Sequence, residues 1–202
     1  MKSFFIAAAL FFTVACANAQ NYGYVVYLHG GVGLPAAPDL YQQNWQSGPS
    51  IGAGVEFTLS QSASIGIGAD YARTPTKKFH LTNGTLNSNA IASGGEFEML
   101  SMAAFLNYRI LGRIGGTFPY LTVDGGVTHM RMSDQTIISA NAGAQTLTGA
   151  SETAYRASGG AGIDIPVSAT VAFSLEVKYI SIFAKDDRRS YVPVEAGFKF
   201  VF

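Results

Sequence analysis

Residues 194–202, the last nine of the chain, read VEAGFKFVF and decide the fold. In an extended strand, successive side chains point to opposite faces. One face here carries Val194, Ala196, Phe198, Phe200 and Phe202, and the other carries Glu195, Gly197 and Lys199. A water-soluble domain rarely ends with three phenylalanines on one face. A strand with lipid on one side and a polar interior on the other accounts for both sets of residues.

Seven earlier segments repeat this alternation. They span residues 21–33, 51–59, 65–72, 100–110, 120–128, 155–165 and 171–179. Most are about 9 to 12 residues long, which is the length that a tilted strand needs to cross a bilayer. Only Ser60 to Ala63 separate the second strand from the third, so these two form the clearest hairpin.

The connections between the eight segments alternate long and short along the chain. Outer-membrane barrels have an even number of strands, short periplasmic turns and long outer loops. The sequence therefore predicts an all-β fold, an eight-stranded antiparallel up-and-down transmembrane β-barrel formed by residues 20–202. Threaded up and down from the periplasm, the strands also place aromatic residues at two levels, as lipid-facing strands require. Tyr22, Tyr24, Tyr108, Phe200 and Phe202 lie near the inner level, and Tyr71, Tyr155 and Tyr179 near the outer one.

The N-terminus has the features of a cleavable export signal. Lys2 supplies a positive charge, residues 4–15 are apolar, and Ala17-Asn18-Ala19 is a small-x-small cleavage pattern. We therefore expect residues 1–19 to be a signal peptide. The apolar run is shorter than the roughly 20 residues that a membrane-spanning helix needs. Lipid attachment at Cys16 is an alternative, although the residues before it lack the leucine usual in lipoprotein signals.

The composition excludes several classes of function. Charged residues make up 13% of the 202 residues, with 13 basic and 13 acidic side chains, so nothing favours a nucleic-acid partner. Glycine is abundant, at 23 residues, which fits a β-rich protein. No segment after the signal approaches 18 consecutive apolar residues, which argues against a helical membrane protein.

The strand faces opposite the apolar ones collect charged side chains. These are Glu56, Asp70, Arg109, Asp124, Arg156, Asp164, Glu176, Lys178, Glu195 and Lys199. The interior of an eight-stranded barrel is just wide enough for side chains to fill it. Because unpaired charges there would be unfavourable, we interpret the set as a structural ion-pair network in the lumen. A proton or ion path, or a narrow pore, is the functional alternative.

No pattern in the chain indicates an enzyme. Some eight-stranded barrels are lipid A hydrolases with a histidine and a serine two residues later at the outer rim, but Arg131 occupies that position after His129. His29, His80 and His129 do not have the spacing of a metal site. Residues 30–33 resemble a phosphate loop only superficially, because no Lys-Ser/Thr follows. We expect no catalytic, cofactor or metal residues.

Four long outer connections are expected. The first contains the turn signals Pro35, Pro38 and Asp39 and a polar stretch up to Pro49. Residues 74–96 contain Asn83-Gly84, a strong hairpin-turn pair, so this loop is expected to project as a short ribbon. Residues 131–152 are rich in Ser, Ala, Thr, Gln and Gly and suggest a mobile loop. Residues 185–189, KDDRR, could meet lipopolysaccharide phosphates or pair among themselves.

With these features together, the chain resembles the small outer-membrane β-barrel superfamily, which includes the OmpA-type transmembrane domain and the OmpX-like barrels of Gram-negative bacteria. The resemblance covers the mature chain and implies location in the outer membrane. It also implies that the barrel-assembly machinery recognises the C-terminal strand through Phe198, Phe200 and Phe202. Because the chain stops at this strand, it leaves no room for the periplasmic domain of full-length OmpA-type proteins.

The leading functional hypothesis is a non-enzymatic, monomeric surface barrel without cofactors. Its four outer loops would contact a host, an extracellular ligand or lipopolysaccharide. A small pore, or a barrel that moves small solutes or apolar molecules through a lateral opening, is the main alternative. A secreted lipocalin-type barrel would place the apolar face inside, and would leave the terminal phenylalanines and the two aromatic levels unexplained.

Overall fold

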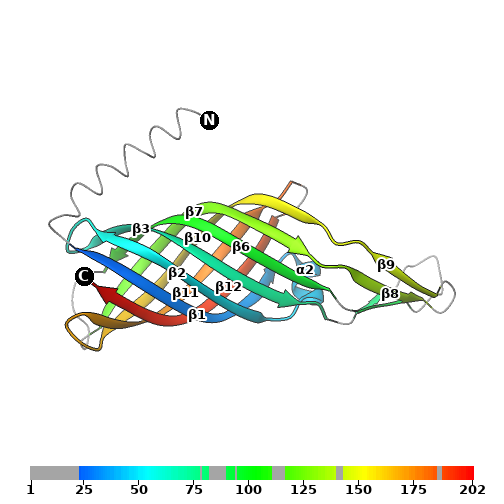
Figure 1. Cartoon of the computed structure of the whole chain (residues 1–202), viewed down its shortest axis with the longest axis horizontal. Helices are drawn as coiled ribbons and strands as arrows, with labels where there is room; N and C mark the ends of the chain where they lie inside the picture. Colours follow the sequence, from blue (N-terminus) through cyan, green and yellow to red (C-terminus); the bar gives the residue numbers. More distant parts are fainter. Residues whose placement is uncertain are drawn as a thin grey trace.

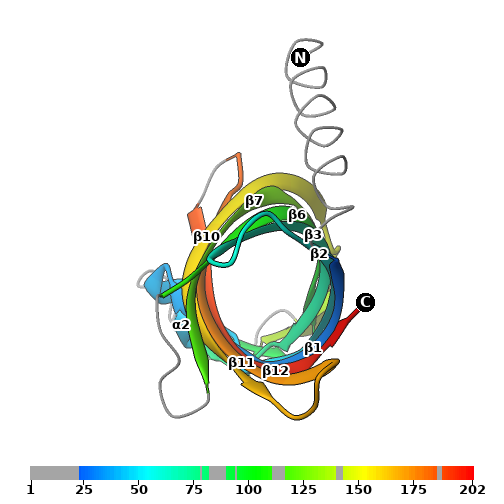
Figure 2. The ribbon, with the colours of Figure 1, turned by 90° about the vertical axis from the view of Figure 1, so that its left-hand side faces the viewer.

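The fold is a closed antiparallel barrel of eight long strands, in the order β1-β12-β11-β10-β7-β6-β3-β2 (Figures 1 and 2). The computed structural model describes residues 23–77, 79–81, 90–93, 95–110, 117–139, 143–185 and 188–202. The barrel strands are β1 (Tyr24–Ala37), β2 (Gly48–Thr58), β3 (Ala63–Pro75), β6 (Glu96–Arg109), β7 (Phe118–Met132), β10 (Ser151–Pro166), β11 (Val171–Phe183) and β12 (Arg188–Val201). Neighbours in the chain are neighbours in the barrel, so the predicted up-and-down topology is confirmed. The expected signal peptide, residues 1–19, lies outside the described residues.

The pairing of the first strand with the last closes the barrel. The ladder runs from Val25 opposite Val201 to Ala37 opposite Ser190. At its end the backbone N–H of Tyr24 donates to the carbonyl of Phe202, and the N–H of Phe202 donates back to the carbonyl of Tyr24. The two rings stack with centroids 5.2 Å apart. Closure removes the unpaired strand edges that a hydrocarbon environment would not tolerate.

We call the end of the barrel where β1 begins and β12 ends the turn end (Figure 1). Tight serine turns join strands there. The Ser60 hydroxyl accepts bonds from the N–H groups of Ser62 and Ala63, and the Ser168 hydroxyl accepts from Thr170 and Val171. A serine side chain that satisfies its own turn explains why so few residues suffice. The predicted short connections after β2 and β10 are therefore confirmed.

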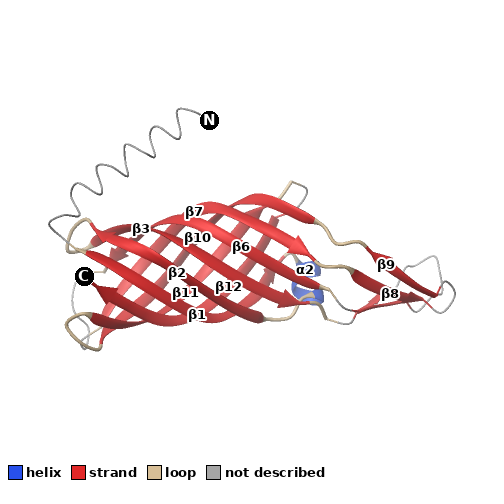
Figure 3. Ribbon diagram, viewed as in Figure 1, coloured by secondary structure: helices blue, strands red, loops and turns tan. Residues whose placement is uncertain are grey.

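The opposite end, which we call the loop end, carries structure of its own. A short helix, α2 (Asp39–Asn44), follows β1. Beyond the barrel, a second sheet has the order β4-β5-β8-β9 (Figure 3). Its strands are β4 (Phe79–Leu81), β5 (Ala90–Ser93), β8 (Gln135–Ser139) and β9 (Gly143–Leu147). No helix in the described part of the chain is both long and apolar enough to cross a membrane.

This second sheet tests two of the loop expectations. The ribbon predicted around Asn83-Gly84 is confirmed by the pairing of β4 with β5, although these two turn residues lie outside the described residues. The expectation that residues 131–152 form only a mobile loop is wrong, because β8 and β9 form a hairpin there. Since β5 pairs with β8, each hairpin supplies the other with a partner strand.

The barrel strands also run further than the alternation suggested. They are 11 to 16 residues long. The expectation of a long, charged final loop at residues 185–189 is wrong in part, because Arg188 and Arg189 already belong to β12. Their guanidinium groups lie over the rings of Phe183 and Phe97, at 5.6 and 5.2 Å from the ring centroids. The contact of Arg188 with Phe183 thus joins β12 to β11 close to their connection, where these two residues are paired.

Candidate functional site

The outer face of the barrel is apolar over most of its height. Large exposed side chains occur on every strand, among them Leu28, Ile51, Ile67, Met102, Val123, Tyr155, Val177 and Phe198. Water would disfavour so wide an apolar surface, whereas lipid tails require it. Tyr24 and Tyr108 at the turn end, and Tyr71 and Tyr179 nearer the loop end, are exposed on the same face. Their rings border the apolar band on both sides.

Inside the barrel, Arg156 on β10 joins two carboxylates from other strands. Its Nη2 lies 3.0 Å from each carboxylate oxygen of Asp124 on β7, and its Nη1 lies 3.0 Å from Oδ2 of Asp70 on β3. Asp70 Oδ1 in turn lies 3.1 Å from Nε2 of His29 on β1. The Arg156 side chain is only 1% exposed, so its charge depends on these partners. Ser158 also donates a hydrogen bond to Asp124.

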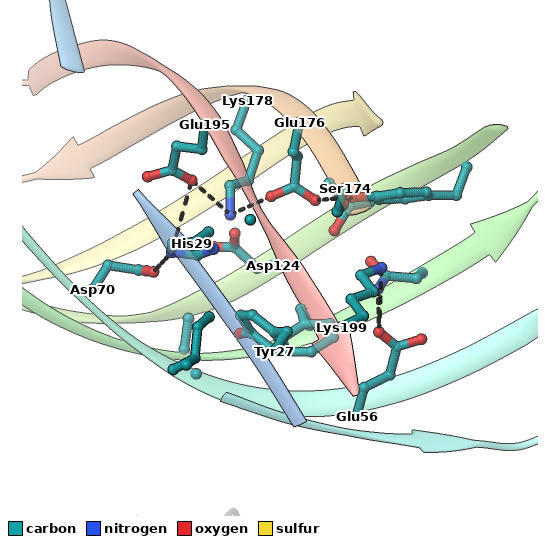
Figure 4. A pocket seen from close by; sticks show the side chains of 18 of the residues that line it. Tyr27, His29, Glu56, Asp70, Asp124, Ser174, Glu176, Lys178, Glu195 and Lys199 are labelled. Atoms are coloured by element: carbon teal, nitrogen blue, oxygen red, sulfur yellow. Dashed lines mark hydrogen bonds and ion pairs between the residues drawn. The ribbon is translucent and has the colours of Figure 1, made fainter. Parts of the chain in front are cut away.

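Lys178 on β11 extends this group across the lumen. Its Nζ lies 2.7 Å from Oε1 of Glu176 and 3.9 Å from Oε2 of Glu195 on β12. Glu195 Oε2 is also 3.8 Å from His29 Nε2, so Glu195 bridges the lysine and the histidine (Figure 4). We call the connected set the Arg156 group; it comprises His29, Asp70, Asp124, Arg156, Glu176, Lys178 and Glu195.

A second set lies nearer the turn end. Lys199 Nζ on β12 is 3.0 Å from Oδ2 of Asp164 on β10 and 3.6 Å from Oε2 of Glu56 on β2. Asn107 Nδ2 donates to Glu56 Oε2 at 3.2 Å, and Ser64 donates to the other oxygen of Glu56. We call this set the Lys199 group; it comprises Glu56, Ser64, Asn107, Asp164 and Lys199.

Tyr120 on β7 connects the two groups. Its hydroxyl donates to Oε2 of Glu176 at 2.9 Å and lies 3.1 Å from the Ser174 hydroxyl. Lys199 Nζ lies 4.3 Å from the centroid of the same ring. The phenol is thus a hydrogen-bond donor to the Arg156 group and a cation–π partner of the Lys199 group.

Nine of the ten charged residues singled out from the sequence therefore meet inside the barrel. Arg109 is placed differently. It is half-buried at the turn end of β6, and its guanidinium lies 6.0 Å from the centroid of the Phe118 ring. Among the described residues it makes no ion pair. Because Arg109 is the last residue of its strand, its side chain reaches the barrel mouth rather than the middle of the lumen.

Sequence reasoning missed the content of the lumen at the loop end, which is apolar. We call it the apolar plug. Its buried members are Ala72, Phe97, Met99, Met130, Ala154, Ile180, Ile182 and Tyr191, with Trp45, Met132 and Ala184 packed against them. Trp45, which follows α2, lies with its ring 5.2 Å from that of Phe97. The sequence does contain an indication of the plug. The inward face of β6 continues from Ser101 to Met99 and Phe97, which are apolar.

The polarity of the barrel wall inverts where the plug begins. On the outer surface at that level, Arg73 forms an ion pair with Glu96, and the Tyr71 hydroxyl donates to Oε1 of Glu98 at 3.1 Å. Arg131 is exposed there too. Towards the turn end, apolar residues face out and charged residues face in. Towards the loop end, polar residues face out and apolar residues face in, as in a water-soluble protein. The wall therefore crosses from lipid into water close to Tyr71.

The two charge groups leave little free space in the lumen. They line a cavity of about 40 Å³, to which Tyr27 and Phe105 also contribute. A cavity of this size holds about three water molecules. Side chains thus fill the polar part of the lumen, and the apolar plug fills the part above it.

The histidines hold positions that offer no evident chemistry. His29 contacts Asp70 inside the barrel, whereas His129 lies on the outer face with its Nδ1 2.9 Å from the Thr153 hydroxyl. His80 lies in β4. Within the described ranges, no three His, Cys, Asp or Glu residues are grouped so that they could hold a metal ion.

A sequence profile described as "Outer membrane protein beta-barrel domain" matches residues 4–200. The chain belongs to this family. It is therefore an integral outer-membrane protein, with the loop end outside the cell and the turn end in the periplasm. None of the curated proteins that were compared with the chain matches it.

Solved structures support the same fold. Neisserial surface protein A (NspA) is 16% identical, with a TM-score of 0.58 over 89% of this chain and 97% of that one. OprG from Pseudomonas aeruginosa is 14% identical, with a TM-score of 0.52 over 89% and 96%. A major outer membrane protein from Thermus thermophilus is 12% identical, with a TM-score of 0.51 over 90% and 100%. At these identities the likeness concerns the fold alone.

Proposed function

We propose that this outer-membrane barrel is a non-enzymatic surface protein whose extracellular part binds a host or other external ligand. The observation that carries the proposal is the sheet β4-β5-β8-β9, which projects beyond the barrel at the loop end (Figure 1). Long loops positioned by a rigid scaffold are where binding activity concentrates. Here they have become an ordered sheet on top of a closed barrel.

The outer strand β9 is the part of this sheet best suited to binding. It pairs with β8 on one side, and no described strand pairs with its other side. Ala144, Gln145 and Thr146 in this strand are exposed. Proteins usually protect such an edge with lysine, proline or a bulge, but β4, β5, β8 and β9 contain no charged residue and no proline. An extended, uncharged segment of a partner could add a strand at this edge.

The filled lumen favours a surface role over the transport alternative. A small-solute pore needs a continuous aqueous path, whereas the charge groups leave a cavity of about 40 Å³ below the plug. An enzymatic role has no support from His129 either, since its partner on the outer face is Thr153 and Arg131 stands two residues later.

Lipopolysaccharide is a second proposed partner, at the outer rim. Arg188 is exposed at the loop end of β12, with its guanidinium over Phe183 and its Nη2 2.9 Å from the Ser181 hydroxyl. An arginine held in this way still has N–H donors free for a phosphate. Lys185 is exposed close by.

Export and assembly form the remaining part of the proposal. Residues 1–19 would direct export as a signal peptide, and Phe198, Phe200 and Phe202 would present the C-terminal strand to the barrel-assembly machinery. In the folded barrel Phe198 and Phe202 are exposed on the lipid side. Replacing Phe202 with Ser should lower the outer-membrane yield; an unchanged yield would remove this assignment.

The surface role is tested by cell binding to immobilised matrix glycoproteins, whose polypeptide chains offer extended segments. We compare Gln145→Pro, which removes a backbone donor from β9, with the matched control Gln145→Ala, which keeps it. We expect Gln145→Pro to abolish most binding while the heat-modifiable barrel form stays unchanged on gels, and Gln145→Ala to bind as the wild type does. Wild-type cells that adhere no better than cells lacking the protein would contradict the proposal.

A further inference from the structure

The Lys199 group carries an uncompensated negative charge inside the barrel. Glu56 and Asp164 contribute two carboxylates, and Lys199 is the single cation within 4.0 Å of them among the described residues. Glu56 is 2% exposed and Asp164 is 4% exposed. The Arg156 group has no cation to spare, because Arg156, Lys178 and the imidazole of His29 face four carboxylates there. Surplus negative charge on side chains this buried is strongly disfavoured unless something offsets it.

The same group also contains two buried acceptor atoms without a donor. Asn107 uses its Nδ2 to bind Glu56, but its Oδ1 has no partner; Asp164 binds Lys199 through Oδ2, but its Oδ1 has none. Nearly all buried polar atoms in folded proteins are satisfied, so two unfilled acceptors in a group with surplus negative charge need an explanation. Asn107 is 6% exposed and lines the lumen cavity.

We propose that the lumen binds one monovalent alkali cation, potassium or sodium, beside Asn107 Oδ1 and the carboxylate of Glu56. Such an ion would satisfy an unfilled oxygen and offset the surplus charge in a single step. Water could fill the acceptors but would leave the charge. A divalent ion fits less well, because no three acidic or histidine side chains in the described part are grouped to hold one.

The position of the site gives the ion a route. Asn107 and Glu56 lie two residues from the turn-end limits of β6 and β2, whereas the apolar plug fills the lumen at the loop end. Exchange would therefore occur with the periplasm. This inference goes beyond the proposed surface role and does not depend on it.

The test is unfolding of the full mature protein in detergent, in potassium, sodium or N-methyl-D-glucamine chloride at equal ionic strength and pH. The organic cation is too large for the cavity. A ligand present at about ten times its Kd lowers the unfolded fraction about tenfold. We expect a saturable gain of that size in potassium or sodium relative to N-methyl-D-glucamine. Equal stability in the three salts would overturn the proposal.

Variants and crystals separate a bound ion from general salt effects. Glu56→Gln and Asn107→Leu should each remove most of the potassium and sodium dependence, while Glu98→Gln, on the outer rim, should keep all of it. If Glu56→Gln does not fold, Asn107→Leu decides: full dependence in this variant would overturn the proposal. Crystals grown in rubidium should show an anomalous peak beside Asn107 Oδ1. A water without anomalous signal at that position would overturn it as well.

Discussion

At the scale of single residues, the charged side chains in the lumen depend on one another, because removing one of them leaves its partner buried without a counter-charge. Arg156 joins Asp70 to Asp124, and these two carboxylates also bind His29 and Ser158 respectively. In water an exposed ion pair contributes little, but a buried charge without its partner is strongly destabilising. The network therefore fixes how the eight strands face one another, more than it adds to the free energy of unfolding.

Replacing Arg156 with Leu should lower the free energy of unfolding by about 3–5 kcal/mol, because the buried Asp124 loses its cationic partner and Asp70 keeps only His29. The measurement is urea unfolding in detergent micelles, followed by the shift in gel mobility. Arg73→Leu is the matched control, since Arg73 pairs with Glu96 on the exposed rim. We expect a much smaller effect there. Similar losses in both variants would show that the lumen pairs behave like surface pairs.

At the scale of strands, each element changes its environment along its own length. In β6, Met102 is 64% exposed to the lipid side, whereas Glu98, four residues earlier on the same face, bonds to Tyr71 at the rim. The residues of β6 that face the lumen change in the opposite sense. They are polar towards the turn end, at Asn107 and Ser101, and apolar towards the loop end, at Met99 and Phe97. One strand thus serves as a membrane strand over part of its length and as a soluble-protein strand over the rest.

An arginine scan along β6 should locate this change. Met102→Arg places a charge in the apolar band and should lower stability by about 2–4 kcal/mol in lipid vesicles, the value for positions near the bilayer midplane. Glu98→Arg should have little effect on stability, because this position already faces water. The readout is the folded fraction in urea titrations. Equal losses at both positions would place the membrane boundary elsewhere.

Alternation in the sequence was enough to predict the eight barrel strands, because one face of each had to be apolar. Each of the eight predicted segments overlaps one strand of the barrel over most of its described length, and the final stretch lies in β12 up to Val201. The hairpin at β8 and β9 could not be predicted, since residues such as Ala144, Gln145 and Thr146 show no alternation. The second partner of β8 is β5, which lies far away in the chain. The plug residues Phe97 and Met99 precede the predicted segment 100–110, so the alternation in that segment does not include them.

At the scale of the whole molecule, the closed barrel encloses two different kinds of interior. The turn-end half contains hydrogen-bonded charges, and the loop-end part contains a packed apolar core that includes Trp45. The outer half of the protein is therefore stabilised in the manner of a soluble domain, and it supports the extracellular sheet. The functional partner of that sheet could not be derived from the sequence, because its strands carry no charged or motif-bearing residue.

The plug should stabilise the molecule by its packing. Phe97→Ala removes a ring that is 2% exposed and contacts Trp45, so we expect a loss of about 3–5 kcal/mol. Trp45 is the only tryptophan of the chain, and its fluorescence therefore reports on the plug. The emission of the folded variant should shift to longer wavelength as water enters. An unchanged spectrum and stability would mean that the ring lies outside the packed core.

The central claim is that this outer-membrane barrel is closed, by its charge network and by its apolar plug. The most direct measurement is the conductance of the purified, heat-modifiable protein in planar lipid bilayers. The closed lumen predicts an insulating membrane without discrete current steps, in wild type and in the rim variant Glu98→Gln alike. Reproducible single-channel steps from the wild-type protein would contradict the claim and turn the barrel into a pore.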